Sequence, residues 1–103
     1  MKIELLYFDG CPSWQTGWIN LKSALQLEGI QSDIDLIKVR DDGDAHRLKF
    51  LGSPNFRVDG HDLWPEEREN YSLSCRVNPT PQGIRGFPTV DMLRHQLEQF
   101  KRA

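Results

Sequence analysis

The chain has 103 residues, with 13 Lys and Arg against 15 Asp and Glu, and 38% of its residues are hydrophobic. This length predicts one domain spanning residues 1–103, since domains commonly contain about 100 to 150 residues. The formal net charge of -2, with both signs interspersed along the chain, provides no basic surface for a nucleic acid.

Cysteine content and short apolar runs limit the kinds of site that the chain can hold. The run at residues 5–8 is far shorter than the roughly 20 residues of a membrane span, and shorter than a signal-peptide core, so we expect a cytosolic protein without membrane contact. Thiols are kept reduced in the cytosol, which makes the two cysteines, Cys11 and Cys75, candidates for chemistry. Two thiols cannot form a four-thiolate zinc site, and the three histidines show no metal-ligand spacing.

The first half of the chain predicts two strands and two helices. Residues 2–8 are rich in Ile, Leu, Tyr and Phe and lead into an Asp-Gly turn, which is typical of a strand. Residues 12–28 predict a helix, because apolar side chains recur at helical spacing and proline is tolerated at the first helical position. Residues 34–39 predict a second strand, and residues 46–51, capped by Asp44, predict a short helix.

The second half predicts a hairpin, a long connection and a final helix. An Asp-Gly pair between residues 55–58 and residues 61–64 is a strong hairpin signal. Residues 65–88 contain four prolines and are expected to be mostly loop, although this is longer than a usual connection. Within them, the alternation of apolar and polar side chains at residues 71–77 predicts a short strand. Residues 89–103 predict a helix with a threonine cap.

In this order, the elements predict an α/β fold with a mixed sheet. The first strand, helix and second strand form a unit in which the two strands run parallel across a right-handed crossover. The hairpin then adds an antiparallel pair, and the last helix follows the inserted segment, residues 65–88. Helices on both faces are the simplest way to bury such a sheet.

Cys11 is expected between the first strand and the first helix. A thiol at a helix N-terminus faces unpaired backbone N–H groups and the positive end of the helix dipole, which favour the thiolate. We therefore expect Cys11 to be an acidified nucleophile. Asp9 opposes that thiolate and partly offsets the effect of the helix terminus, although turn formation with Gly10 is its simplest interpretation.

Three motifs of the chain are Leu5-Leu6-Tyr7-Phe8-Asp9-Gly10-Cys11-Pro12-Ser13-Trp14, Gly52-Ser53-Pro54 and Val58-Asp59-Gly60. With them the chain resembles the thioredoxin-like superfamily, in particular the small glutaredoxin-type redoxins, in the order of elements over nearly its whole length. It is also similar to uncharacterised bacterial thioredoxin-like proteins that are sometimes labelled alkylmercury lyase. The resemblance implies that Pro54 is a cis proline packed against the reactive cysteine. It also implies that Ser53 offers its backbone to an extended thiol substrate.

One position departs from the dithiol redoxins. Where they carry a second cysteine, three residues after the first, this chain has Trp14. The resemblance therefore leaves a monothiol mechanism or a distant resolving thiol, for which Cys75 is the candidate. In the resembling fold the inserted segment begins near the site and can bring Cys75 back to Cys11. The apolar alternation around Cys75 equally fits a core-facing cysteine, and Arg76 is interpreted as a solvated charge.

The sequence thus predicts a thiol–disulfide oxidoreductase that acts on a thiol or disulfide substrate, small molecule or protein, without a cofactor. Cys11 is the predicted nucleophile and Cys75 the candidate resolving thiol. The residues expected to contact the substrate are Pro12, Trp14, Ser53 and Pro54. Two alternatives stay open: a non-catalytic thioredoxin-like binding module, and a protein that binds mercury or copper(I) through two thiolates.

Overall fold

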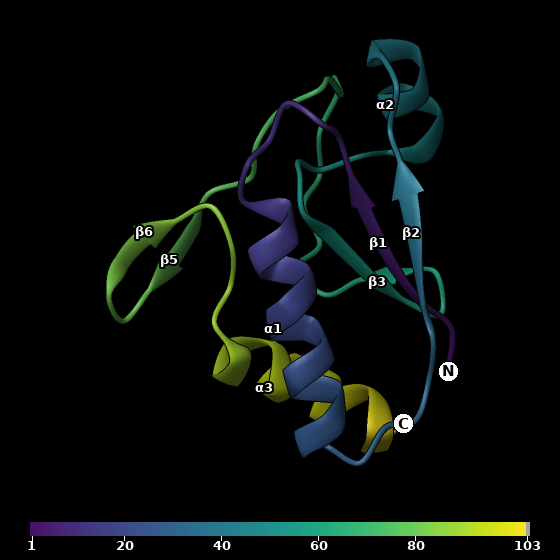
Figure 1. Cartoon of the computed structure of the whole chain (residues 1–103). Coiled ribbons are helices and arrows are strands. Elements are labelled where there is room, and N and C mark those ends of the chain that lie inside the picture. The colour runs from purple at the N-terminus through teal and green to yellow at the C-terminus, as the bar shows by residue number, and fades with distance from the viewer. Residues whose placement is uncertain (103) are drawn as a thin grey trace.

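Strands and helices alternate in the first half of the chain, and a helix ends it (Figure 1). The structure is a computed structural model that describes residues 1–102, with Arg102 described by its backbone alone. Within these residues, no helix has both the length and the apolar character needed to cross a membrane. In chain order the elements are β1 (Ile3–Tyr7), α1 (Trp14–Leu27), β2 (Ile34–Lys38), α2 (Asp42–Leu48), β3 (Asn55–Val58), β4 (His61–Asp62), β5 (Asn78–Thr80), β6 (Gly83–Arg85) and α3 (Val90–Arg102).

β1 lies inside the main sheet, whose strand order is β2-β1-β3-β4. It pairs in parallel with β2, with Leu5 opposite Leu36, and antiparallel with β3, with Leu5 opposite Phe56. β3 and β4 form the hairpin predicted at the Asp-Gly turn, where Val58 pairs with His61. The mixed sheet expected from the sequence is therefore confirmed.

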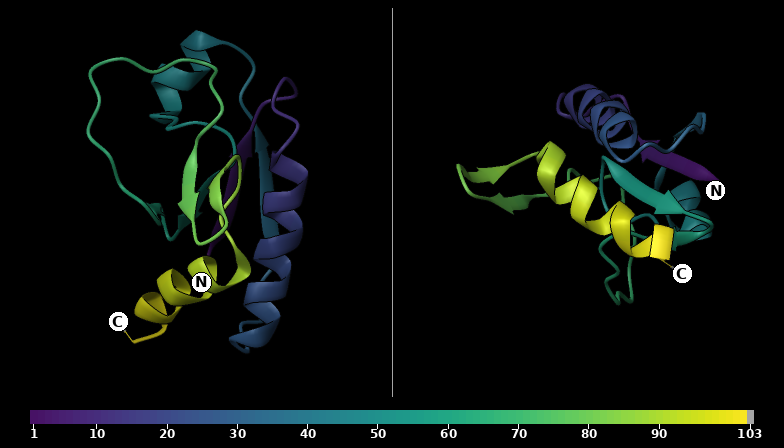
Figure 2. Two further views of the ribbon diagram at one scale, coloured as in Figure 1. Left: turned by 90° about the vertical axis from the view of Figure 1, so that its left-hand side faces the viewer. Right: turned by 90° about the horizontal axis from the view of Figure 1, so that it is seen from below.

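Helices cover both faces of this sheet, because β1 buries side chains on both sides. Leu5 and Leu6 are neighbours in one strand, so they point to opposite faces, and both are fully buried. Leu5 belongs to a core that it shares with α1 and α3, and Leu6 to a second core that includes Ala45 of α2. α1 and α3 pack against each other, whereas α2 lies apart from them, beyond the carboxyl end of β2 (Figure 1, Figure 2).

The short helix begins and ends earlier than the sequence predicts. α2 spans Asp42–Leu48 rather than residues 46–51, and its N-cap is Asp41 rather than Asp44. The Asp41 carboxylate accepts the backbone N–H of Asp44 at 2.7 Å, and acidic residues in the first turn suit the positive end of the helix. Phe50 follows the helix and fills the second core with a fully buried side chain.

The inserted segment before the last helix differs most from the prediction. The strand predicted over residues 71–77 is wrong, because within that stretch Cys75 alone makes a β-bridge. The alternating apolar side chains instead attach the segment to the sheet. Tyr71 and Leu73 pack on the second core, while Val77 is exposed. The segment also contains a hairpin that the sequence did not predict, β5–β6, which projects away from the rest of the molecule (Figure 1, Figure 2).

α3 follows the predicted course. The Thr89 hydroxyl oxygen accepts the backbone N–H of Met92 at 3.1 Å, which caps the helix as expected. Leu93 and Leu97 are fully buried in the first core. The last residue of the predicted helix, Ala103, lies outside the described residues.

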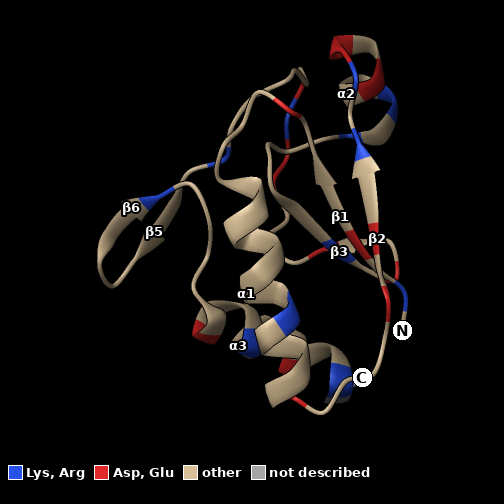
Figure 3. Ribbon diagram, in the orientation of Figure 1, with Lys and Arg blue, Asp and Glu red and all other residues tan. Residues whose placement is uncertain are grey.

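Charges of both signs are scattered over the elements, in agreement with the composition (Figure 3). α1 is the exception, since Lys22 is its single charged residue. The Lys22 ammonium lies 4.0 Å from the centre of the Trp18 ring, where the face of the indole attracts it. The helix that follows Cys11 is therefore nearly uncharged.

Candidate functional site

Cys11 lies in the turn between β1 and α1, where the sequence predicts it. Its backbone N–H donates to the Phe8 carbonyl at 3.2 Å, which closes the turn. Its side chain points inward: Cys11 is 1% exposed, and its thiol donates to the carbonyl oxygen of Ser53 at 3.3 Å. A partner therefore reaches this sulfur only if the residues that cover it move.

Ser53 and Pro54 lead into β3 and are both fully buried. The peptide bond between them is cis, as the resemblance implies. Pro54 packs against α1 at Gly17, where a Cβ would lie 2.9 Å from the Pro54 ring. The pair thus contacts Cys11 through the carbonyl of Ser53 and the helix through the ring of Pro54.

The backbone of Ser53 is paired with a short segment, residues 74–76, which we call the strap. Ser53 donates its N–H to the Ser74 carbonyl at 2.8 Å, and Arg76 donates its N–H to the Ser53 carbonyl at 3.0 Å. The two hydrogen bonds make a parallel bridge in which Cys75 lies opposite Ser53. The backbone groups that the resemblance assigns to an extended substrate are therefore occupied by the protein's own strap.

Cys75 meets Cys11 from this position. Ser53 brings the two cysteines near each other, because its carbonyl accepts from the Cys11 thiol and its backbone bridges Cys75, which is exposed at the surface. Partial burial of the sulfur, the hydrogen bond with Cys11 and the charge of an ionised Cys11 together raise the pKa of the Cys75 thiol to about 11. The inserted segment thus returns Cys75 to Cys11, and the alternative of a core-facing cysteine does not match the structure.

Gly52 allows the strap to come this close to Ser53. Its φ is +115°, a conformation that residues with a Cβ rarely adopt. A Cβ at this position would also lie 3.0 Å from the backbone nitrogen of Arg76 and 3.1 Å from its Cα. In the sequence Gly52 directly follows the predicted helix over residues 46–51, and in the structure it supports the strap.

Arg76 anchors the strap through a largely buried ion pair. Its guanidinium donates to the Asp62 carboxylate at 3.3 Å and to the carbonyl of Trp64, and the paired side chains of Arg76 and Asp62 are 12% and 10% exposed. The same carboxylate accepts N–H groups from the Asn55 side chain and the Trp64 backbone. The interpretation of Arg76 as a solvated charge is therefore wrong.

The chain just before the strap is also held in place. The backbone N–H of Leu73 donates to the Asp42 carboxylate at 3.0 Å. The ring of Tyr71 meets the edge of His46, with ring centroids 5.7 Å apart. These contacts tie the segment to α2, so Cys75 is positioned by interactions on both sides of it.

Pro12 and Trp14 contribute differently from Ser53 and Pro54. Trp14 stacks on Tyr7, with ring centroids 4.0 Å apart, and packs against the first core. Pro12 is exposed just before α1. Of the four residues expected to contact a substrate, the structure brings Ser53 to both cysteines and uses Pro54 and Trp14 for packing.

Asp9, the acidic residue nearest to Cys11 in sequence, is paired with a lysine. Its carboxylate lies 2.5 Å from the ammonium of Lys38, and this hydrogen bond and charge raise the pKa of Lys38. The negative charge expected to oppose the Cys11 thiolate is thus partly neutralised by β2. Among residues 1–102, no three or more His, Cys, Asp or Glu side chains are grouped to hold a metal ion.

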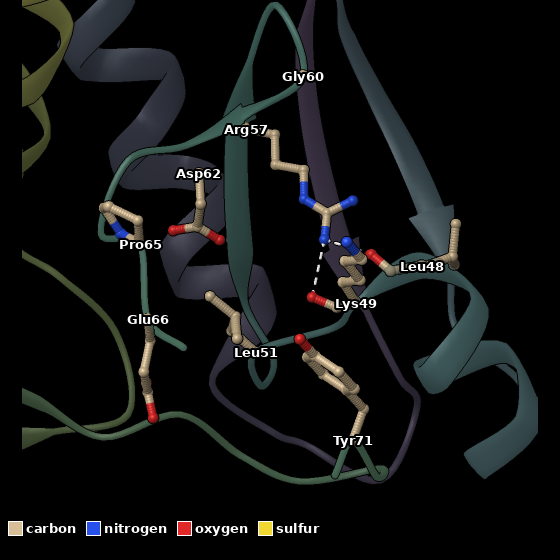
Figure 4. A pocket seen from close by; sticks show the side chains of 9 residues that line it. All are labelled: Leu48, Lys49, Leu51, Arg57, Gly60, Asp62, Pro65, Glu66 and Tyr71. Atoms are coloured by element: carbon tan, nitrogen blue, oxygen red, sulfur yellow. Dashed lines mark hydrogen bonds between the residues drawn. The ribbon is translucent and has the colours of Figure 1, made fainter. Parts of the chain in front are cut away.

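A separate pocket of about 250 Å³ lies between the end of α2 and the β3–β4 hairpin, and neither cysteine lines it (Figure 4). Arg57 reaches across this pocket to the carbonyl of Lys49 at 3.0 Å and also donates to the carbonyl of Leu48. A cation suits these carbonyls at the C-terminal end of a helix. Asp62 forms part of the wall, so the carboxylate that holds Arg76 also links the pocket to the strap.

The arrangement offers two neighbouring sulfurs, a carbonyl shared between the Cys11 thiol and the strap, and a largely buried ion pair that fixes the strap. The sequence indicated the sulfurs but not Gly52, Asp62 or the role of Arg76. Comparisons of the chain with protein-family models, with curated proteins and with solved structures find no match. The function is therefore argued from the residues of this chain.

Proposed function

We propose that the protein carries out thiol–disulfide exchange in a thioredoxin-like domain, with Cys11 and Cys75 as its redox pair. The observation that carries the proposal is that Ser53 of the cis Ser53–Pro54 peptide holds both cysteines, Cys11 through its carbonyl and Cys75 through a β-bridge. The parallel and antiparallel pairing of β1 and the helices on both sheet faces support the thioredoxin-like assignment. The partner is a thiol or a disulfide, on a small molecule or a protein.

The exchange is written for the oxidised protein and two molecules of a partner thiol. One partner thiolate attacks a sulfur of the Cys11–Cys75 disulfide, the S–S bond breaks, and its electron pair stays on the leaving sulfur. A second partner thiolate attacks the partner's sulfur in the mixed disulfide and releases the partner disulfide. The protein gains two electrons and two protons, and the partner loses them. The two sulfurs store the electrons, so this reaction requires no cofactor.

The Cys75 sulfur is a poor carrier of negative charge. Its pKa is raised to about 11 by partial burial, by a hydrogen bond from Cys11 and by the charge of an ionised Cys11. Because a more basic thiolate is the poorer leaving group, exchange disfavours the steps in which Cys75 is released.

Mild oxidation is expected to form the Cys11–Cys75 disulfide within one chain. Both cysteines are held on Ser53, so we expect the disulfide to form without unfolding of the strap. Intact-mass and peptide-mapping measurements after diamide treatment test this: the wild-type protein should lose two hydrogens, while Cys11→Ser and Cys75→Ser should not. Two cysteines that both remain open to alkylation after treatment would contradict the proposal.

Alkylation of Cys75 is expected to depend on pH in a way that Cys11 controls. In the reduced wild-type protein the rate should still be rising at about pH 10, because the thiolate reacts and the pKa of Cys75 is about 11. In Cys11→Ser the hydrogen bond and charge of Cys11 are absent, so the midpoint should fall. Iodoacetamide labelling read by mass spectrometry measures both profiles. Equal midpoints in the two proteins would contradict the thiol contact.

Soft-metal binding is the second candidate function, because two adjacent thiolates suit linear two-coordinate mercury(II) or copper(I). It predicts uptake of one metal ion per reduced chain that either single-cysteine variant loses, together with no exchange activity towards thiols. The binding-module alternative predicts two unreactive thiols and no metal uptake. Redox exchange without tight metal binding distinguishes the proposed function from both alternatives.

A further inference from the structure

We propose that Cys75 is the sulfur at which a partner thiolate attacks the oxidised protein, and that Cys11 is the sulfur that leaves. This inference rests on the proposed function and assigns the two cysteines their order in it. It differs from the expectation that Cys11, the cysteine before the first helix, forms the bond with the partner. Three observations support it: the exposure of Cys75, the position of Cys11 before α1, and the pairing of the strap with Ser53.

The two cysteines differ in how accessible they are to a partner in solution. Cys11 is 1% exposed, whereas Cys75 is exposed at the surface. Displacement at a disulfide sulfur needs the attacking thiolate to reach that sulfur directly, so accessibility decides which of the two reacts. The carbonyl oxygen of Ser53, which lies 3.3 Å from the Cys11 sulfur, also presents a partial negative charge to an incoming anion. Both effects direct the attack to Cys75.

The position of Cys11 before α1 favours a leaving thiolate. Cys11 precedes the first residue of α1 by three positions, so charge left on its sulfur develops near the positive end of a helix of 14 residues. Cys75 has no helix following it, and burial, the hydrogen bond with Cys11 and the charge of Cys11 all disfavour its thiolate. When the S–S bond breaks, its electron pair therefore goes to Cys11, and the new S–S bond joins the partner to Cys75.

The pairing of the strap with Ser53 also favours attack at Cys75, because it occupies the backbone groups that a partner chain would need beside Cys11. Ser53 uses its N–H and its carbonyl to hold Ser74 and Arg76, so an incoming chain finds no open strand edge there. Attack at Cys75 leaves both hydrogen bonds intact, whereas attack at Cys11 requires the strap to separate from Ser53. Gly52, Asp62 and Arg76 act as positioning residues, because they keep the strap in place without touching the partner.

Mapping the first mixed disulfide tests the assignment. Oxidised wild-type protein is mixed with N-acetylcysteine, quenched with N-ethylmaleimide at increasing short times and mapped by mass spectrometry. Extrapolated to zero time, N-acetylcysteine should be on Cys75 and maleimide on Cys11, with at least about a tenfold excess over the reverse pattern. The same oxidised chain in guanidinium chloride is the control, and there the preference should largely disappear.

The outcomes separate this inference from the proposed function. N-acetylcysteine mainly on Cys11, or an equal division in the folded protein, overturns the assignment while leaving exchange intact. A preference that persists unchanged in the unfolded chain also overturns it, because the fold would then not be its cause. If oxidation never forms the Cys11–Cys75 disulfide, the proposed function fails, and the assignment fails with it.

Discussion

Gly52→Ala is expected to separate Cys75 from Cys11 and to lower the free energy of unfolding by about 3 kcal/mol. Two causes add at this position. The φ of +115° is unfavourable for alanine, and the new Cβ would lie 3.0 Å from the backbone nitrogen of Arg76. The strap must therefore move away from Ser53. Urea denaturation measures the stability, and the yield of intramolecular disulfide after diamide treatment measures the separation.

Gly29→Ala is a matched control for this variant. Gly29 also has a positive φ, +68°, but a Cβ there would meet nothing within 4 Å. It should therefore cost about 1 kcal/mol through backbone strain alone and leave the disulfide yield unchanged. If Gly52→Ala forms the Cys11–Cys75 disulfide as readily as Gly29→Ala, the strap does not depend on Gly52, and the account of its positioning is wrong.

Arg76→Met is expected to destabilise the protein by about 3 kcal/mol, because it leaves the largely buried Asp62 carboxylate without its cation. The hydrogen bond from the Arg76 side chain to the Trp64 carbonyl is lost as well. Since the strap loses its anchor, the equilibrium with a dithiol reductant should also shift towards the reduced protein. Urea denaturation measures the first effect, and redox titration monitored by alkylation measures the second.

Three further variants define the role of Arg76. Arg76→Lys keeps the charge but not the forked guanidinium, so it should recover part of the stability and part of the disulfide equilibrium. Combining Arg76→Met with Asp62→Asn removes the uncompensated charge and should cost less than the sum of the single changes. Arg68→Met breaks an exposed pair with Glu66 and should change stability by less than about 1 kcal/mol. Equal losses in Arg68→Met and Arg76→Met would contradict an anchoring role for Arg76.

Most of the main sheet and the two long helices could be predicted because their patterns are local and continuous. β1, α1, β2 and α3 each show a continuous apolar pattern, in which the helices face one core and the two strands contribute to both. The β5–β6 hairpin could not be predicted in this way. Its strands have three residues each, one contains a proline, and Ile84 is 70% exposed, so no buried face leaves a pattern in the sequence.

The site shows the same division between local and long-range information. Cys11 before a helix and Ser53-Pro54 before a strand are local signals, and the resemblance to redoxins gave them a meaning. The contacts of Arg76 with Gly52 and Asp62 join residues far apart in sequence, so no spacing rule indicates them. The apolar alternation at residues 71–77 favoured a strand, because docking of alternate side chains on a core leaves the same pattern.

Because Cys11 is buried and Cys75 is exposed, peroxide dissolved in the solvent reaches Cys75 first and oxidises the small fraction of it that is thiolate. A sulfenic acid formed on Cys75 lies against the sulfur of Cys11, whose thiolate can attack it, form the disulfide and release water after proton uptake. Only a sulfur that meets a second peroxide before this step goes on to sulfinic acid, which thiols do not reduce. Cys11 therefore protects Cys75 from irreversible oxidation, and burial protects Cys11 from peroxide.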